Sequence, residues 1–240
     1  MNRIDGRRTD ELRRVTLETG FSDFAEGSCL ITCGRTKVLC TASVEEKVPP
    51  HVAPGTGWVT AEYAMLPRAN RQRSSRDIAK LKLSGRSAEI QRLIGRSLRA
   101  CVDLSALGER TIVIDCDVLQ GDGGTRTASV TGGFVALCLA CKQLVQSGKL
   151  ERMPIRGYLA AVSAGIVGNT PMLDLCYEED SSAMVDLNCV MNEKQELIEL
   201  QGTGERRPYS VKEEEQLLKL CAKGIGELIA AQKLALGDLQ

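Results

Sequence analysis

Histidine and aromatic residues are scarce in this chain of 240 residues. It contains one histidine, His51, together with one tryptophan, four tyrosines and three phenylalanines. A single histidine argues against a histidine-based catalytic triad and against a zinc site that needs several imidazole ligands. We therefore expect any catalysis to depend on carboxylates, arginines or a metal ion.

A long hydrophobic run is also missing. The longest unbroken apolar stretch, residues 134–141, has eight residues, whereas ~18 are needed to span a bilayer. Charged residues follow the initial methionine closely, which is not the pattern of a secretory signal. We therefore expect a cytoplasmic protein without a membrane partner.

The ten cysteines are dispersed, and most of them stand inside apolar segments. In a chain without an export signal, this usage indicates reduced core residues and not a disulfide framework. The 31 basic residues balance the 31 acidic ones, and no repeat or low-complexity linker interrupts the sequence. A single domain over residues 1–240 is the simplest organisation.

Hydrophobic periodicity and turn residues predict an α+β fold. The predicted strands are residues 28–33, 37–45, 111–119, 158–167, 172–177, 184–191 and 196–201. The predicted helices are residues 84–100, the segment from the glycines at 121–124 to about residue 145, and the segment from Ser210 to about residue 236. Gly34 marks a hairpin turn between the first two strands, and Ser210 with Glu213 forms a capping box. The last four strands are expected to be antiparallel.

The balanced charges are unevenly distributed. Residues 68–99 hold eight arginines and two lysines but only two acidic residues. Arginine binds phosphate through two parallel hydrogen bonds, so this excess favours an anion-binding or RNA-binding surface over a merely solvated helix face and loop. The candidate RNA-binding residues are Arg68, Arg73, Arg76, Arg92, Arg96 and Arg99.

A predicted strand is followed by Gly123, Gly124, Thr125 and Arg126 and then by a helix; we call these four residues the phosphate cradle. Glycines let the backbone approach a ligand closely, and the free N–H groups of a first helical turn attract anions. Such turns are often purely structural, which is the alternative. Arg86 begins the other helix, and if the two helix starts converge, they would hold one phosphate from both sides.

Residues 173–188 alternate apolar and polar residues and suggest a hairpin. Its even positions carry Asp174, Asp180, Asp186 and Asn188. Register depends on the turn, so parity alone does not place them on one face. An unpaired carboxylate at Asp186, between two apolar residues, would be costly. We therefore predict Asp180 and Asp186 as a carboxylate pair that binds Mg²⁺ with substrate phosphates or acts as a general acid. Glu178 and Glu179 are expected to form only a polar turn.

Together, a basic surface, a phosphate cradle and a carboxylate pair suggest attack of inorganic phosphate on a phosphodiester. The negative charge of the transition state is spread over phosphoryl oxygens, which arginines, N–H groups and Mg²⁺ stabilise. The expected products are nucleoside diphosphates. A metal-dependent hydrolase that uses water is the alternative, and a requirement for phosphate separates the two.

Long blocks of the sequence resemble the bacterial ribonuclease PH family, whose members are phosphate-dependent 3′→5′ exoribonucleases that trim tRNA precursors. The matching blocks run nearly end to end and include GRRxDELR from residue 6, GWVTAEY from residue 57, MLPR from residue 65, SGR from residue 84, EIQRLIGRSLRA from residue 89, DCD from residue 115, DGGTRTAS from residue 122 and QGT from residue 201. The chain departs from the family pattern at Asn70, Arg71, Asp77, Gly121 and Gly204.

The resemblance implies the ribosomal protein S5 domain 2-like fold and a homohexameric ring built as a trimer of dimers. It implies that the attacking phosphate is bound by Arg86, Gly124, Thr125 and Arg126, and that Asp180 and Asp186 form the catalytic pair. Arg68, Arg73 and Arg76 match positions associated with RNA contact and ring assembly. The expected substrates are tRNA precursors and other RNA with a single-stranded 3′ end. A catalytically silent RNA-binding ring subunit is the alternative, which would be marked by loss of Arg126 or of the carboxylates.

Overall fold

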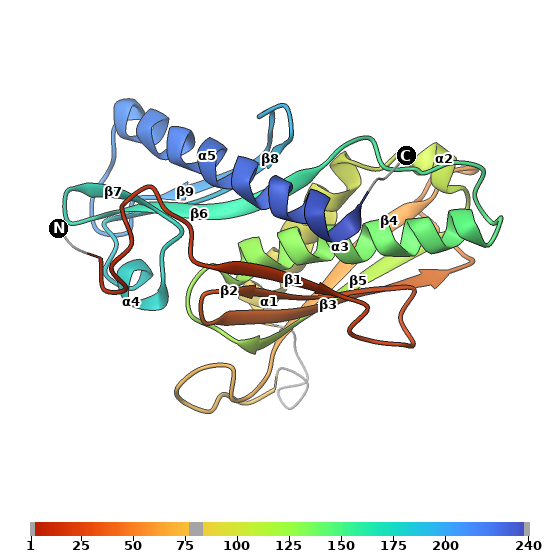
Figure 1. Ribbon diagram of the computed structural model, residues 1–240, viewed down its shortest axis with the longest axis horizontal. Helices are drawn as coiled ribbons and strands as arrows, with labels where there is room; N and C mark the ends of the chain where they lie inside the picture. Colours follow the sequence, from red (N-terminus) through yellow and green to blue (C-terminus); the bar gives the residue numbers. More distant parts are fainter. Residues whose placement is uncertain (1–2, 77–83, 238–240) are drawn as a thin grey trace.

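A computed structural model describes residues 3–76 and 84–237, and it shows two β-sheets with helices packed on them (Figure 1). The first sheet has the strand order β1 (Val15–Thr19), β2 (Gly27–Cys33), β3 (Thr36–Glu45), β5 (Thr111–Gln120) and β4 (Trp58–Met65). The second has the order β7 (Thr170–Leu173), β6 (Leu159–Val167), β8 (Val185–Asn192) and β9 (Leu197–Thr203). The helices are α1 (Gly85–Ala100), α2 (Leu104–Leu107), α3 (Thr125–Gln146), α4 (Tyr177–Asp180) and α5 (Val211–Leu236). The predicted α+β class is confirmed.

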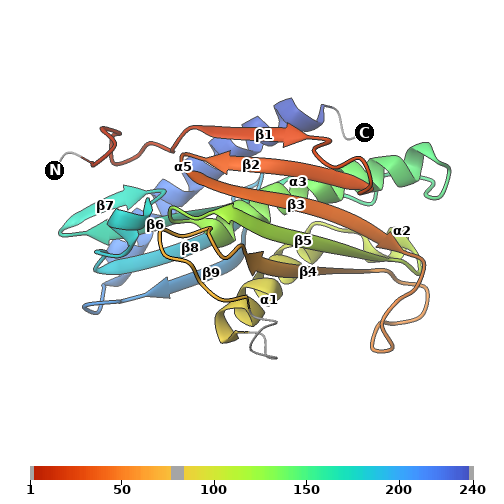
Figure 2. The same cartoon turned by 90° about the horizontal axis from the view of Figure 1, so that it is seen from below.

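The first sheet contains the predicted hairpin, in which β2 and β3 pair in antiparallel register around Gly34. Its edge strand β4 lies parallel to β5 (Figure 2). A parallel pair needs a long crossover connection, and the segment with α1 supplies it. This crossover brings the beginning of α1 to the same end of the sheet as the end of β5.

Helix α1 buries the predicted apolar stripe of Ile90, Leu93, Ile94 and Leu98. Ser84 caps its N-terminus by accepting a hydrogen bond from the Ser87 backbone N–H. Helix α3 is apolar on nearly every side, because it packs against the first sheet, β6 and α5 (Figure 1). It is the one described helix with the length and hydropathy to cross a membrane, and most of it is buried inside the protein.

The second sheet packs against α5, which begins at the predicted capping box of Ser210 and Glu213. Strand β6 is buried at every position, because neighbours cover both of its faces. The predicted antiparallel pairing of this sheet is confirmed. All ten cysteines are free and buried, as expected for core residues.

The secondary-structure prediction was wrong for the segment between β7 and β8. The strand expected over residues 172–177 ends at Leu173, and residues 173–188 are not a hairpin, because β7 and β8 lie on opposite sides of β6. Asp174 adopts a left-handed conformation with φ 52° and ends the strand. Helix α4 follows, so Asp180 lies on a helix and strand parity did not apply to it. Strands β1 and β4 and helices α2 and α4 were also missed by the sequence patterns.

Candidate active site

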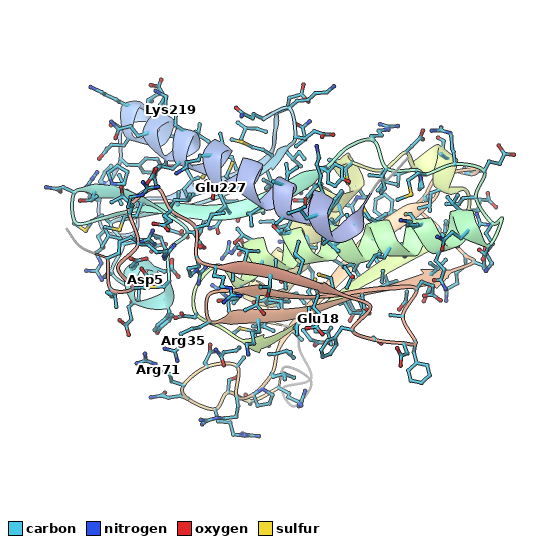
Figure 3. The ribbon with its side chains drawn as sticks, in the orientation of Figure 1. Asp5, Glu18, Arg35, Arg71, Lys219 and Glu227 are labelled. Carbon is cyan, nitrogen blue, oxygen red and sulfur yellow. The ribbon has the colours of Figure 1, made fainter. Side chains whose placement is uncertain are left out.

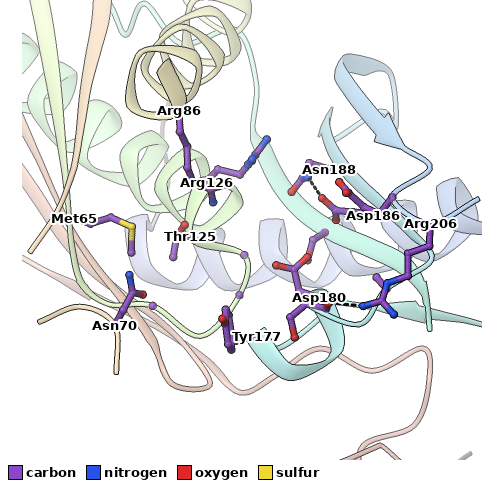
Figure 4. A pocket seen from close by; sticks show the side chains of 17 residues that line it. Met65, Asn70, Arg86, Thr125, Arg126, Tyr177, Asp180, Asp186, Asn188 and Arg206 are labelled. Carbon is purple, nitrogen blue, oxygen red and sulfur yellow. Dashed lines mark hydrogen bonds between the residues drawn. The ribbon is translucent and has the colours of Figure 1, made fainter. Parts of the chain in front are cut away.

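A cavity of about 740 Å³ opens where the two sheets meet, and Figure 4 shows its lining side chains. The cavity is lined by all the predicted phosphate-binding and catalytic residues: Arg86, Gly124, Thr125, Arg126, Asp180 and Asp186. They come from α1, α3, α4, β8 and the turn after β5. The two helix starts that carry Arg86 and Arg126 therefore converge on one space, opposite the two carboxylates.

The turn of the phosphate cradle requires glycine at two successive positions. Gly123 and Gly124 have φ of 76° and 64°, which is the left-handed region. A Cβ atom at Gly123 would lie 2.4 Å from the carbonyl oxygen of Leu175. The Thr36 hydroxyl fixes this turn by donating to the Gly123 carbonyl at 2.7 Å and accepting from the Asp122 N–H at 2.9 Å.

Helix α3 begins in this turn without a side-chain cap and without an acidic residue in its first turn. The N–H groups at such a helix start have no intrahelical partner and carry a partial positive charge. Thr125, the first helical residue, is buried, and its hydroxyl lies 2.9 Å from that of Tyr63. The start of α3 is thus suited to bind an anion that enters the cavity.

Two arginines, one from the first turn of α3 and one from α1, lie next to each other at this helix start (Figure 4). Arg126 is largely buried, and its Nη1 donates to the side-chain oxygens of Gln201 at 3.0 Å and Glu89 at 3.3 Å. Arg86 is exposed, lines the cavity and forms no ion pair with any residue in the described ranges. One arginine is therefore held in place, whereas the other is free to close on a ligand.

The two carboxylates lie in a poorly solvated part of the cavity. Burial raises the pKa of Asp180 above its usual value, although the charges of Arg86 and Arg126 oppose this. Burial, together with the charge of Asp180, raises the pKa of Asp186 to about 6. The Asn188 amide, two residues further along β8, donates to Asp186 at 3.1 Å. Proton or cation binding between these carboxylates would relieve their repulsion.

The donor set fits Mg²⁺ that keeps bonds to water or substrate. In the described ranges, no three Asp, Glu, His or Cys side chains gather closely enough to hold a metal by themselves. Mg²⁺ is commonly bound through one or two carboxylates completed by phosphate oxygens and water. Asp180 and Asp186 could supply those two carboxylates.

Five of the six predicted RNA-binding arginines are exposed, and the sixth, Arg99, is partly buried. Arg68, Arg73 and Arg76 are exposed in the loop after β4, and Arg92 and Arg96 are exposed on α1. Residues 77–83, with Asp77, Lys80 and Lys82, lie outside the described residues.

Arg99 has a different environment from the other candidates, because its side chain is half-buried. Its Nη1 donates to the Val59 carbonyl at 2.7 Å, and its guanidinium lies 4.2 Å from the centre of the Trp58 ring. These contacts join α1 to β4, so we assign Arg99 a structural role in this chain.

One expectation about an acidic residue needs correction. Glu179 is not part of a solvated turn: it is 4 % exposed and accepts two hydrogen bonds from Arg3, at 2.8 and 2.6 Å. In the loop after β4, Arg71 pairs with Glu178 of α4 at 3.1 Å. Figure 3 shows Arg71 in the loop below the two sheets. Both partners are distant in sequence, so no local pattern could indicate them.

Sequence reasoning also missed part of the cavity wall. Tyr63 does not line the cavity but contacts the lining residue Thr125, and it lies on a strand that was not predicted. Asn70 and Gly121, two departures from the family pattern, line the cavity side by side: a Cβ atom at Gly121 would lie 3.2 Å from Asn70 Oδ1. Gly121 thus makes room for Asn70. Asn188 could have been found, because it follows Asp186 at the two-residue period of a strand.

The chain matches known sequence profiles over most of its length. Residues 11–143 match domain 1 of the 3′ exoribonuclease family, RNase PH, and residues 157–225 match domain 2 of the same family. The two matched parts correspond to the first sheet with α1 and most of α3, and to the second sheet with most of α5.

Solved structures share the fold. An archaeal exosome core aligns with a TM-score of 0.79 at 24% identity, covering 97% of this chain and 91% of that one. The Archaeoglobus fulgidus exosome with RNA bound to its active site gives 0.81 at 24% identity, with coverages of 95% and 91%. Rice (Oryza sativa) Rrp46 gives 0.78 at 16% identity, with coverages of 98% and 100%.

Proposed function

The chain belongs to the RNase PH family of 3′ exoribonucleases, and from this premise we propose that it shortens RNA from the 3′ end by phosphorolysis. Inorganic phosphate is the attacking co-substrate, and nucleoside diphosphates are the products. The proposal is carried by one observation: Arg86, Arg126 and the uncapped start of α3 face the same cavity as Asp180 and Asp186.

The cradle suits the attacking phosphate. The N–H groups at the start of α3 and the Thr125 hydroxyl can donate to its oxygens, while Arg126 and Arg86 offer charge-assisted hydrogen bonds from either side. Phosphoryl transfer needs positioned donors and cations more than a covalent nucleophile, because the nucleophile is the phosphate itself. These groups would hold it for in-line attack on the terminal phosphodiester.

The carboxylate side suits the leaving group. Cleavage leaves a new 3′-oxygen on the shortened RNA, which must gain a proton. Burial raises the pKa of both carboxyls, and that of Asp186 reaches about 6, so a fraction of the molecules carries a proton on Asp186 near neutral pH and can donate it there. When bound by the same two carboxylates, Mg²⁺ supplies neutralisation of charge on the phosphoryl oxygens.

The remaining parts of the proposal concern the RNA and the assembly. We expect tRNA precursors and other RNA with a single-stranded 3′ end as substrates, in the cytoplasm. Exposed Arg68, Arg73, Arg76, Arg92 and Arg96 would bind phosphates of the RNA body or contact neighbouring subunits. A homohexameric ring is the proposed assembly. An exosome core among the similar structures, and RNA in the active site of another, support these proposals.

The experiment that tests the function uses a tRNA with an unpaired 3′ extension, Mg²⁺, and the protein with or without inorganic phosphate. Nucleoside diphosphates released only when phosphate is present are the expected result. Nucleoside monophosphates released without phosphate would indicate hydrolysis and contradict the proposal.

A catalytically silent RNA-binding subunit is the remaining alternative. It would bind the tRNA and release no nucleotide under either condition. The chain retains Arg126, Asp180 and Asp186 in one cavity, which favours the active enzyme.

A further inference from the structure

A buried arginine outside the cavity wall contacts both sides of the candidate site. Arg13 lies in the N-terminal segment before β1, and its side chain is 5 % exposed. Its guanidinium donates to the Asp122 and Gly123 carbonyls of the turn that precedes α3, the shortest of these bonds being 2.5 Å. It also binds both carboxylate oxygens of Asp174, at 3.0 and 2.6 Å. One side chain thus joins the cradle turn to the segment that ends at Asp180.

Arg13 has no donor left for a substrate. A guanidinium carries five N–H donors, and the five side-chain hydrogen bonds of Arg13 all go to Asp122, Gly123 and Asp174. The Arg13 backbone N–H donates to Asp174 as well, at 2.8 Å. Its role is therefore to fix other groups and not to bind phosphate.

The partner of Arg13 is held in a conformation that needs support. Asp174 is buried and has φ 52°, one of two positive φ values outside glycine in the described ranges. Its carbonyl accepts hydrogen bonds from Arg3 and Arg7 of the same N-terminal segment, at 2.9 and 3.1 Å. Burial would raise the pKa of Asp174, but the charge and hydrogen bonds of Arg13 outweigh it and lower the pKa. Asp174 is therefore ionised and tightly bound at neutral pH.

The two segments that Arg13 joins also touch each other directly. Gly123 packs on the backbone of Leu175 and Cys176 so closely that no side chain would fit between them. Asp180 follows Cys176 after one turn of α4. Loss of the Arg13–Asp174 ion pair would therefore disturb both α4 and the glycine turn of the cradle.

We propose that Arg13, through its ion pair with Asp174, is a positioning residue. It holds the phosphate cradle and the segment from Asp174 to Asp180 at a fixed position relative to each other. This inference rests on the proposed function for its catalytic consequence, but not for its structural one. Misplacement of reacting groups by 1 Å can cost about 100-fold in rate, so one residue outside the cavity can control the reaction.

Arg13→Lys is the test, with Arg3→Lys as the matched control. Lysine keeps the charge but cannot bind Asp174 with a fork and reach two carbonyls at the same time. Arg3 is an equally buried arginine of the same N-terminal segment; it binds Glu179 and the carbonyls of Leu173 and Asp174 but makes no hydrogen bond to residues 121–124. The control therefore disturbs the Asp180 segment without disturbing the cradle directly.

Hydrogen exchange of backbone amides is the first readout, and it does not depend on activity. We expect Arg13→Lys to increase exchange in both segments, residues 121–126 and 174–180, and Arg3→Lys to increase it only in the second. Asp174→Asn, which keeps a residue type tolerant of positive φ, should reproduce the pattern of Arg13→Lys. Unchanged exchange in residues 121–126 for both Arg13→Lys and Asp174→Asn would overturn the inference.

Steady-state kinetics gives the second readout. Arg13→Lys should raise the KM for phosphate about tenfold or more and lower kcat, whereas Arg3→Lys should leave the KM for phosphate within about twofold of wild type. Equal changes of that KM in the two variants would reduce Arg13 to a general stabilising role. If wild-type protein released no nucleoside diphosphate, the proposed function would fail while the exchange experiment still decided the positioning role.

Discussion

The hydroxyl oxygen of Tyr63 on β4 lies 2.9 Å from that of Thr125, the first residue of α3. Both side chains are buried, and burial raises the pKa of the Tyr63 phenol. Tyr63 therefore stays protonated at neutral pH and can donate to Thr125, whose own hydroxyl hydrogen then remains for an anion in the cradle. Through Tyr63, strand β4 thus leaves the Thr125 hydroxyl free to donate to an anion at the start of α3.

Tyr63→Phe should raise the KM for phosphate by roughly 2- to 10-fold, which corresponds to the loss of one hydrogen bond of about 0.5–1.5 kcal/mol. Phosphorolysis rates at varied phosphate concentration measure this effect. Tyr158→Phe removes a hydroxyl that does not line the cavity and serves as the control. Equal KM values for the two variants would show that Tyr63 does not act through Thr125.

Arg126→Ala should raise the phosphate concentration needed for half-maximal activity and cut kcat/KM by roughly 10- to 100-fold, because a charge-assisted hydrogen bond worth about 1.5–3 kcal/mol is lost. The oligomeric state of the variant should equal that of the wild type, which light scattering can check. Arg96→Ala provides the matched control, since Arg96 is also an arginine that faces a carboxylate, Glu199 at 3.5 Å, but is exposed outside the cavity. Unchanged phosphate kinetics in Arg126→Ala would remove Arg126 from the site.

Asp180→Asn should slow turnover by about 100-fold or more if Asp180 donates a proton or binds the metal. Glu178→Gln is the control, because Glu178 lies on the same helix but is exposed, and among the described residues its side chain pairs only with Arg71. Single-turnover rates of the two variants give the comparison. Wild-type rates in Asp180→Asn would contradict its assignment.

Asp186→Asn should stabilise the protein at neutral pH. The pKa of Asp186 is raised to about 6 in the folded protein from an ordinary value of 3.8, so ionisation in the folded state costs free energy. Stability of the wild type therefore falls as pH rises from about 4 to about 6, and the penalty is complete above that window. The variant should gain ~1–3 kcal/mol at pH 7.5 and almost nothing at pH 4.

Denaturant unfolding of Asp186→Asn and wild type across pH 4–8, without divalent cations, measures this difference. Adding Mg²⁺ should stabilise the wild type more than the variant, because the ion binds the folded state through the carboxylate. A difference in the free energy of unfolding that is the same at every pH would show that folding does not raise the pKa of Asp186.

Two arginines of the predicted RNA-binding set, Arg92 and Arg99 on α1, should behave differently. Arg99→Ala should lower stability by about 1–2 kcal/mol, since it loses its hydrogen bond to Val59 and its contact with Trp58. Arg92→Ala, on the same helix but exposed, should leave stability within about 0.5 kcal/mol and weaken RNA binding with a shallower salt dependence. Thermal melts and binding titrations at several salt concentrations separate the two effects; the reverse pattern would restore Arg99 to the RNA surface.

The local elements of this fold could be read from the sequence because local interactions define them. The Ser210 capping box, the hairpin at Gly34 and the apolar stripe of α1 each depend on residues a few positions apart, and the structure confirms them. Several residues that line the cavity could also be predicted from the sequence. Glycines before a helix and an arginine at each helix start suggest anion binding, and a carboxylate between apolar residues of a strand suggests a functional group. The roles assigned to these residues stay predictions.

Tertiary structure alone decided how these pieces meet. Asp180 lies on a helix because Asp174 ends the strand in a left-handed conformation, and the buried ion pair with Arg13, 161 positions earlier, supports that conformation. Separation in sequence likewise hid the burial of Glu179 by Arg3, 176 positions apart, and the contact of Arg99 with Val59 of β4, 40 positions apart. The sequence by itself determined which residues are candidates for chemistry and where the helices and strands with local signals form. Only the tertiary structure decided how the site residues lie relative to one another, because long-range ion pairs and the crossover to a parallel strand fix those positions. Such contacts leave no periodic signal along the chain.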